Sequence, residues 1–568
     1  MKRSTVMNYL VEIAKKNKFL VCIYLLSGIL IAFLSNFSAN YFQRLIDKFN
    51  DGSLAVSNII IYGFVLAIVC VLDYLDEYPG RSLEHGIYID LKLKALNKIS
   101  RIDYQVYQSM GTGKLVQKIE NGASAGKGVL FDFLFCLFRQ LCPSILFSMI
   151  FIYSINKKVM LIILIGYIAV FFITNLLLKV LYQIKERILS NEEMMNRILV
   201  RGFMEMVVFR INKRFKHEIE KAELAKKEIV NSKVKMTLIH EAFFAIFALL
   251  VIVIKIFIIA YGWVTKSLSI GAIIALITLI DNAYTPIAIF NVLFVQYKLD
   301  RTAFKRYTDF LDSENDEQLD KGEKITSLKA DISCTGLKFL YDNRVVLDNF
   351  DLNIRHGENV ALVGESGSGK STLIKLLSGL LKPQGGKISI GTYELNNIDL
   401  NSYYDCITYI TQESPIFDGT LRENLVFDKN VEDYEIIKAL EQVELLDLYN
   451  KLENGLDTEL GERGTALSGG ERQRLALARL WFSQANIIIL DEATSAMDNI
   501  TEEIVMNRAM DLLRTQTVIV IAHRLNSIRK FEHIVVLREG RIVGQDSFNK
   551  LLENNAYFKD LYYASTRD

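Results

Sequence analysis

The chain has 568 residues, a length that suggests several domains. It carries 66 Lys and Arg against 65 Asp and Glu, so the charge balance gives no electrostatic reason to expect a nucleic-acid partner. Hydrophobic residues make up 51% of the chain and its mean hydropathy is positive, which is high for a soluble protein and indicates membrane spans.

The N-terminal stretch, residues 4–17, is amphipathic, and we expect a helix that lies along the inner surface of a membrane. The apolar run that follows it, Phe19–Phe37, is too long for the core of a cleavable signal peptide. Few residues precede this run, so we expect no N-terminal cysteine peptidase and no substrate maturation coupled to transport.

The first half of the chain contains apolar segments, each close to the roughly 20 residues that span a bilayer. They cover about 19–40, 57–79, 129–155, 158–181, 240–263 and 270–297. Long connections rich in Lys and Arg follow the second and the fourth segments, which predicts that both connections and both termini are cytoplasmic. Apolar residues recur at helical spacing in these connections, so we expect helices that extend below the membrane and turn near 104–110 and 209–216.

Three acids near the end of the second segment fall at helical spacing, so Asp73, Asp76 and Glu77 are expected to share one helix face. One hypothesis is that they line an inward-open cavity and favour cationic cargo. Asp281 would then add a deeper negative charge unless Arg139 neutralises it. The alternative is a solvated acidic face on a helix that is already emerging into the cytoplasm.

Composition changes after residue 312. We expect an all-α domain of six membrane-spanning helices with long cytoplasmic extensions over 1–312, a charged linker over 313–324, and an α/β domain over 325–568.

A phosphate-binding loop of the form G-x-x-x-x-G-K-[ST] lies in the second domain, after the apolar strand predicted over 359–363 and before a helix over 372–380. The loop residues are Gly364, Glu365, Ser366, Gly367, Ser368, Gly369, Lys370, Ser371 and Thr372. Its glycines let backbone N–H groups and the helix N-terminus face phosphates. Lys370 is expected to reach the β- and γ-phosphates and Ser371 to ligate Mg²⁺. A chance Gly/Ser-rich turn is the alternative, which the flanking strand and helix disfavour.

An unbroken apolar run, Ile487–Leu490, ends in two acids and is typical of a buried central parallel strand. Asp491 at its carboxyl end is expected to hold Mg²⁺ through water, and Glu492 to polarise an attacking water. The alternative, plain core, is disfavoured because two acids at the end of a buried run need a nearby cation.

Ser468 and Glu471 fit a capping box at a helix start, and the glycine pair Gly469 and Gly470 leaves that N-terminus open to an anion. A capped helix without any ligand is the alternative. His523 follows another apolar strand, 518–522, where a γ-phosphate contact is possible.

Together these motifs resemble the ATP-binding cassette (ABC) half-transporters of the exporter type, across essentially the whole chain. In this resemblance 364–372 is the Walker A loop, 487–491 the Walker B strand, 467–471 the signature, 495–498 the D-loop, and 458–464 the X-loop that marks exporters. The turns near 104–110 and 209–216 resemble the two coupling helices. Glu471 stands where glutamine is commonest and Met497 where leucine is usual; neither departure implies lost activity.

The resemblance implies site roles. The catalytic residues would be Glu492, His523 and Gln412. The ligands of Mg²⁺ would be Ser371, Gln412 and Asp491. The ATP contacts would come from Tyr341 at the adenine, from the whole loop 364–372, and from Ser468, Gly469, Gly470, Glu471 and Asp498.

It also implies two cassettes that sandwich two ATP molecules, so the partners would be a second half-transporter (a homodimer favoured, a heterodimer possible), the lipid bilayer and the exported substrate. We expect a multi-pass protein of a bacterial inner membrane that exports a peptide or an amphipathic small molecule. A lipid flippase is the main alternative, and a membrane sensor or channel of this architecture is another. A soluble P-loop ATPase is excluded by the apolar segments.

Overall fold

The computed structural model describes residues 4–427, 429–461, 464–465, 467–522 and 524–565. The chain divides into two compact units, Met1–Ser100 with Met110–Ser313, and Arg101–Ser109 with Glu314–Asp568. The segment Arg101–Ser109 therefore belongs with the second unit, although its neighbours in the chain on both sides belong to the first.

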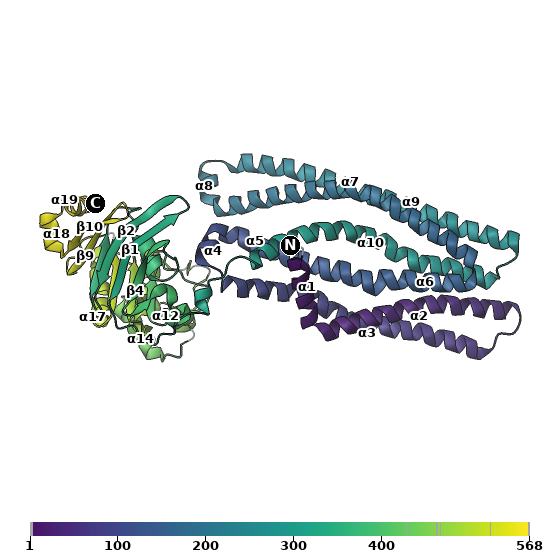
Figure 1. The fold of residues 1–568 in the computed structure, drawn as a ribbon, viewed down its shortest axis with the longest axis horizontal. Coiled ribbons are helices and arrows are strands. Elements are labelled where there is room, and N and C mark those ends of the chain that lie inside the picture. Colours follow the sequence, from purple (N-terminus) through teal and green to yellow (C-terminus); the bar gives the residue numbers. More distant parts are fainter. Residues whose placement is uncertain (1–3, 428, 462–463, 466, 523, 566–568) are drawn as a thin grey trace. The chain divides into compact units, whose positions relative to one another are not determined.

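The first unit consists of helices, several of them long (Figure 1). They are α1 (Ser4–Lys16), α2 (Lys18–Asn50), α3 (Val56–Ile99), α5 (Thr112–Lys127), α6 (Cys142–Ile155), α7 (Lys157–Met204), α8 (Met206–Ile211), α9 (Phe215–Thr265) and α10 (Ile270–Leu311), with π-helical turns over Gly128–Phe135 and Leu137–Leu141. Within the described residues, four helical stretches are long and apolar enough to cross a membrane: Lys18–Asn50, Val56–Ile99, Lys114–Ile155 and Phe215–Thr265. The predicted spans 158–181 and 270–297 lie within α7 and α10.

Local chemistry explains where these helices break. The Asn156 side chain accepts hydrogen bonds from the backbone N–H groups of Lys158 and Val159, and so starts α7 directly after α6. The Ser269 side chain accepts one from the N–H of Ala272 and starts α10 in the same way. Buried apolar residues of α2, α6, α7, α9 and α10 then form one core cluster: Ala39, Ile152, Val159, Ile163, Val251, Ile258, Leu276, Leu279 and Ile280.

The hypothesis that Asp73, Asp76 and Glu77 line one cavity is wrong for Asp76 and stays a prediction for the other two acids. Asp76 is buried and forms an ion pair with Arg139 as well as a hydrogen bond with Ser27, whereas Asp73 and Glu77 are exposed. Asp281 pairs with Lys255 at 2.6 Å, and Arg139 pairs with Asp76. The acids of α3 therefore lie in different environments. Helix α2 and the π-helical turn Leu137–Leu141 contact Asp76, whereas Asp73 and Glu77 remain exposed.

The second unit contains two sheets. A four-stranded antiparallel sheet has the order β2-β1-β4-β5, and a six-stranded sheet has the order β10-β9-β3-β8-β7-β6. The strands are β1 (Ile332–Tyr341), β2 (Arg344–Ile354), β3 (Asn359–Val363), β4 (Gly385–Ile390), β5 (Tyr393–Glu394), β6 (Ile407–Ile410), β7 (Ile487–Asp491), β8 (Thr517–Ile521), β9 (His533–Arg538) and β10 (Arg541–Asp546). The helical domain followed by an α/β domain confirms the predicted fold class.

Parallel pairing in the six-stranded sheet gathers the motif residues at one edge. Strand β3 pairs in parallel with β8, and β7 pairs in parallel with both β8 and β6. The carboxyl ends of these strands therefore meet, as in other open α/β sheets that bind ligands there. Every residue of β7 and of β8 is buried, which confirms both as interior strands.

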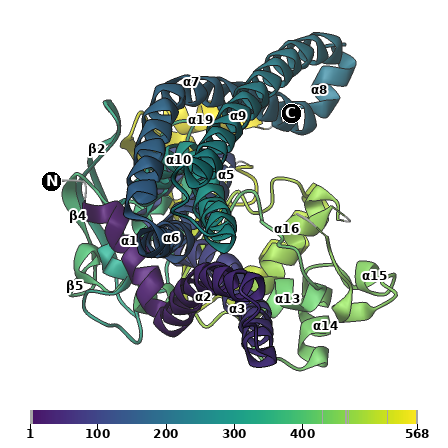
Figure 2. The same ribbon diagram turned by 90° about the vertical axis from the view of Figure 1, so that its right-hand side faces the viewer.

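The remaining helices of this unit are α4 (Tyr104–Met110), α11 (Lys370–Leu377), α12 (Leu400–Tyr404), α13 (Leu421–Val426), α14 (Asp433–Gln442), α15 (Leu446–Tyr449), α16 (Gly469–Ala478), α17 (Asn499–Leu512), α18 (Phe548–Asn554) and α19 (Ala556–Ser565). Helices α13 to α16 form a group of their own, as Figure 2 shows. Tyr104 of α4 packs against the core cluster that includes residues of β1 and α11, and the Nζ of Lys375 lies 5.9 Å from the centre of its ring.

Candidate nucleotide site

The loop between β3 and α11 has a shape that only glycine permits at three of its positions. Gly364, Gly367 and Gly369 have φ angles of +151°, +83° and +105°. A Cβ atom on Gly364 would lie 2.2 Å from the carbonyl oxygen of Leu537. The loop is therefore closed tightly against the sheet, and its curl leaves a concave run of backbone that fits phosphate groups.

Lys370 begins α11 and turns back into this loop. Its Nζ donates to the carbonyl oxygen of Gly364 at 2.7 Å and to that of Glu365 at 2.9 Å, and the residue is only 7% exposed. Burial lowers the pKa of the Lys370 ammonium, against the opposing influence of Glu492 and Asp491. A buried cation that is held by neutral carbonyl groups lacks a full counter-charge, which suits the loop to an anionic ligand.

Asp491 and Glu492 stand at the end of β7, as predicted. Asp491 is 6% exposed, and burial raises its pKa although the Tyr409 hydroxyl donates a hydrogen bond of 3.0 Å to its Oδ2. Glu492 accepts a hydrogen bond from Nε2 of Gln412 and has a left-handed backbone with φ of +50°. A non-glycine residue in this conformation stores strain, which is common at functional sites.

The predicted capping box at the start of α16 is present. The backbone N–H of Ser468 donates to Oε2 of Glu471 at 2.7 Å, and the N–H of Glu471 donates to Oγ of Ser468 at 3.3 Å. The bond with Ser468 lowers the pKa of the Glu471 carboxyl. Ser468 is exposed, and among the described residues no hydrogen bond joins 468–471 to the loop 364–372. The N-terminus of α16 is thus open to a ligand from outside this cassette.

The other predicted residues are placed as follows. Asp498 caps α17, where its Oδ1 accepts from the N–H groups of Ile500 and Thr501, and these bonds lower its pKa. Tyr341 ends β1 with its ring 5.0 Å from that of Phe339. Ser371 is exposed on the first turn of α11 and Thr372 is buried. His523 lies outside the described residues.

Sequence reasoning missed the hydroxyl of Tyr409. The signal available in the sequence was that Tyr409 lies three residues before Gln412. In the structure Tyr409 lies on β6, which pairs with β7, and it is in register with Ile489. The residues that the structure brings together at the edge of the sheet are thus the phosphate loop, Asp491, Glu492, Gln412 and Tyr409.

The residues present fit ATP with Mg²⁺. A buried ammonium in a glycine loop suits phosphate oxygens. The buried carboxylate of Asp491 and the exposed hydroxyl of Ser371 are the kinds of oxygen ligand that Mg²⁺ prefers. Among the described residues no cluster of three or more His, Cys, Asp or Glu side chains forms a separate metal site. Any Mg²⁺ would therefore depend on the phosphates for most of its ligands, as is usual for this ion.

Comparisons with known proteins agree with this geometry. The protein-family model described as "ABC transporter transmembrane region" matches residues 21–284, and the one described as "ABC transporter" matches residues 347–495. The chain is similar, over 96% of its length and 98% of the other chain, to a solved structure titled "Structure of a bacterial Atm1-family ABC exporter with ATP bound", with a TM-score of 0.83 and 20% identity.

Two curated relatives extend the comparison. The lactococcin-A transport/processing ATP-binding protein of Lactococcus lactis is 26% identical over 99% of this chain and 79% of its own length. The ATP-dependent lipid A-core flippase of Ralstonia nicotianae is 37% identical over 43% of each chain. The match spans about half the length or less of several other curated relatives. With an ABC transporter transmembrane region and an ABC transporter domain in one chain, the protein belongs to the ABC transporter family.

Proposed function

We propose that this chain drives export of a peptide or an amphipathic small molecule across a bacterial inner membrane, powered by ATP hydrolysis at its cassette. The observation that carries the proposal is the joint arrangement of the phosphate loop, Asp491, Glu492 and Gln412 at one sheet edge, in a chain whose other half is a set of apolar helices.

The proposed chemistry uses the residues in separate roles. The loop amides and Lys370 bind and orient the β- and γ-phosphates, which neutralises charge that develops during phosphoryl transfer. Glu492 orients and polarises the attacking water, and Gln412 holds the carboxylate of Glu492 in place through its amide. Asp491 and Ser371 would hold Mg²⁺, which supplies positive charge to the phosphates when bound.

The open N-terminus of α16 supports a dimer in which Ser468–Gly470 of one subunit completes the ATP site of the other. A second support is the short helix α8, which exposes Val207, Val208 and Ile211. Apolar residues gathered on a six-residue turn between two long helices are suited to cover a partner's surface. We propose that this surface is the cassette of the second subunit, which would lie in the cytoplasm with both termini.

The substrate class rests on the relatives. One is named for transport of lactococcin A, and this favours a peptide. The charge pattern gives no reason to prefer a cationic cargo, because Asp76 and Asp281 each have a basic partner. The flippase relative favours a second candidate, lipid translocation. ATPase stimulation by added peptides or by added lipids, measured in nanodiscs of fixed composition, separates the two.

The function is tested by Glu492→Gln. We expect the variant to bind ATP as tightly as the wild type and to lose phosphate release, because the loop and Lys370 are untouched while the group that polarises water is neutral. Bound nucleotide and steady-state phosphate release in detergent measure both. Phosphate release within a few-fold of wild type would refute the role of Glu492.

A further inference from the structure

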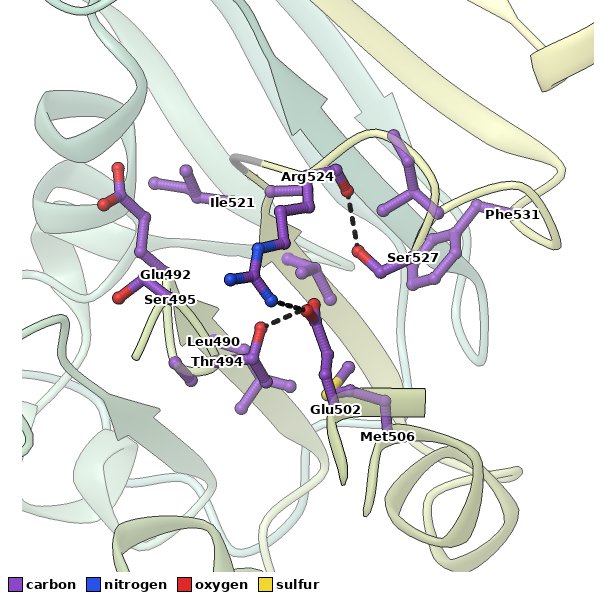
Figure 3. Close-up of a pocket in the computed structure, with 14 residues that line it drawn as sticks. Leu490, Glu492, Thr494, Ser495, Glu502, Met506, Ile521, Arg524, Ser527 and Phe531 are labelled. Carbon is purple, nitrogen blue, oxygen red and sulfur yellow. Dashed lines mark hydrogen bonds and ion pairs between the residues drawn. The ribbon is translucent and has the colours of Figure 1, made fainter. Parts of the chain in front are cut away.

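A polar cluster beside the D-loop, 495–498, lies outside all of the motifs described above (Figure 3). Arg524 donates from Nη1 to the carbonyl oxygen of Met497 at 2.8 Å and to Oε2 of Glu502 at 2.7 Å. Thr494, two residues beyond Glu492, donates from its hydroxyl to Oε1 of Glu502 at 2.9 Å. One buried carboxylate thus joins the segment after Glu492, the helix α17 and the residue that follows His523.

The carboxylate at the centre of this cluster is buried, which distinguishes the cluster from a surface ion pair. Glu502 is only 4% exposed, whereas the Arg524 side chain retains 40% exposure. A buried carboxylate is costly without a cation and further hydrogen bonds, and Glu502 has both. A cavity of about 20 Å³ lies alongside, lined by Glu492, Ser495 and Ile521 among others.

The D-loop is also held by α16, the signature helix, which begins within the signature residues 467–471. Gln473 donates from Nε2 to the hydroxyl of Ser495 at 2.9 Å, and its Oε1 accepts from the backbone N–H of Ala496 at 2.7 Å. Three consecutive residues of the D-loop are therefore anchored, two to the signature helix and the third, Met497, to Arg524.

We propose that Arg524 and Glu502 are positioning residues for ATP hydrolysis: they fix the D-loop between the segment after residue 523 and the signature helix, without touching the nucleotide. The proposal rests on the proposed function of this site. Because Arg524 bonds a backbone carbonyl of the D-loop, its loss frees that loop, and the reacting groups nearby lose their alignment while the phosphate loop is unchanged.

The test compares Arg524→Gln, Glu502→Gln and the double variant in the full-length chain. Arg524→Gln leaves a buried carboxylate without its cation, so both the Tm and kcat are expected to fall. The double variant removes both charges, so its Tm returns towards wild type. Its kcat stays roughly 10- to 100-fold low, the cost of a small misplacement of reacting groups. The KM for ATP stays near wild type in all three, because no ATP contact changes.

Two controls sharpen the result. Arg514→Gln removes an exposed ion pair between Asp511 in the last turn of α17 and Arg514 just beyond it, whose side chains are 68% and 75% exposed, and should change neither Tm nor kcat. Arg524→Lys keeps the cation beside Glu502 and should recover part of kcat. If kcat recovers together with Tm in the double variant, or if KM rises while kcat stays constant, the positioning role is refuted. The proposed function is tested separately. If the wild-type chain hydrolyses ATP and Glu492→Gln does not, that function stands whether or not the positioning role of Arg524 and Glu502 is refuted.

Discussion

The ammonium of Lys370 is buried and is held by two carbonyl oxygens of its own loop. Burial keeps the pKa of the Lys370 ammonium below the ordinary value of 10.5, so folding makes the charged form less stable than it is in the unfolded chain. The stability that the neutral form contributes is fully present above that ordinary value and is lost as the pH falls through the folded pKa. The charged Lys370 ammonium therefore destabilises the nucleotide-free fold, and the same charge is suited to bind the phosphates of ATP.

Lys370→Met should accordingly separate stability from binding. We expect the nucleotide-free Tm to stay level or to rise, and the Tm increase on adding ATP to disappear. Each hydrogen bond to a charged group contributes about 1.5–3 kcal/mol, so the affinity for ATP should fall at least roughly tenfold. Thermal unfolding with and without ATP measures both. Lys387→Met, at an exposed lysine on β4, is the control and should keep the wild-type shift. A lower nucleotide-free Tm for Lys370→Met would contradict the argument.

At this scale the sequence predicted which motif residues meet at the edge of the sheet but not the residues that hold them in place. Lys370, Asp491 and Glu492 belong to short motifs in which chain-local geometry sets their positions. Tyr409 and Arg524 act across strands and loops that are distant in sequence, and a single sequence does not reveal such pairings. His523 remains a prediction, since it lies outside the described residues.

Among the elements, α16 shows how a helix start serves two purposes. Its capping box satisfies two backbone N–H groups and leaves Ser468 exposed and the two glycines half-buried. Bonds with Ser468 keep the pKa of Glu471 below its ordinary value of 4.5. The resulting stabilisation is complete above that value and is lost as the pH falls through the folded pKa.

Glu471→Gln and Glu471→Ala should therefore differ. Glutamine keeps the hydrogen bond to Ser468 and loses only the charge near the helix N-terminus, which costs about 0.3–1 kcal/mol. Alanine loses the hydrogen bond as well and should lower the Tm further, while glutamine should keep ATPase activity at pH 7. Tm measured from pH 7 to well below pH 4.5 checks the sign, because the wild-type advantage over glutamine should shrink as the pH falls through the folded pKa. An advantage that grows in acid would contradict the assignment.

The helix α3 illustrates what periodicity leaves open. Helical spacing correctly predicted α3 as a helix, yet it placed Asp73, Asp76 and Glu77 on one face without showing which side a neighbour covers. The Arg139 guanidinium lies 4.4 Å from the Tyr24 ring and pairs with Asp76, so α2 and the π-helical turn bury that acid alone. This contact joins residues that are far apart in the chain, and no local pattern encodes it.

Asp76→Asn should therefore be far more damaging than Asp73→Asn. Removing one partner of a buried ion pair leaves the other charge uncompensated, at a cost of about 3–5 kcal/mol. Asp73 is exposed on the same helix and its substitution should stay within about 0.5 kcal/mol. The Tm of each variant in one detergent measures the difference. Equal Tm values would mean that the Arg139 pair does not stabilise the membrane half.

At the scale of the whole chain, the order of the two halves followed from hydropathy and motif order, because long apolar helices and a glycine loop are local signals. The assignment of Arg101–Ser109 to the second unit did not follow, since it depends on the bridge between Ile102 and Asn315 and on the packing of Tyr104. Helix α8, at the second of the two predicted turns below the membrane, belongs to the first unit.

Quaternary structure is the last expectation to test at this scale. One chain carries Lys370, Gln412, Ser468 and Glu492, and it also carries the exposed α8 surface that we propose a second cassette covers. Two identical copies can therefore supply both halves of two intact sites.

We expect differently tagged copies, expressed together without any other half-transporter, to co-purify and to hydrolyse Mg-ATP. Adding Glu492→Gln subunits during expression should reduce the activity of the mixed dimers, because each carries one disabled site. The decisive comparison is with the chain co-expressed with a different half-transporter. If the chain alone is inactive while that neighbour restores hydrolysis, the second cassette that covers α8 and completes the sites must come from a different protein.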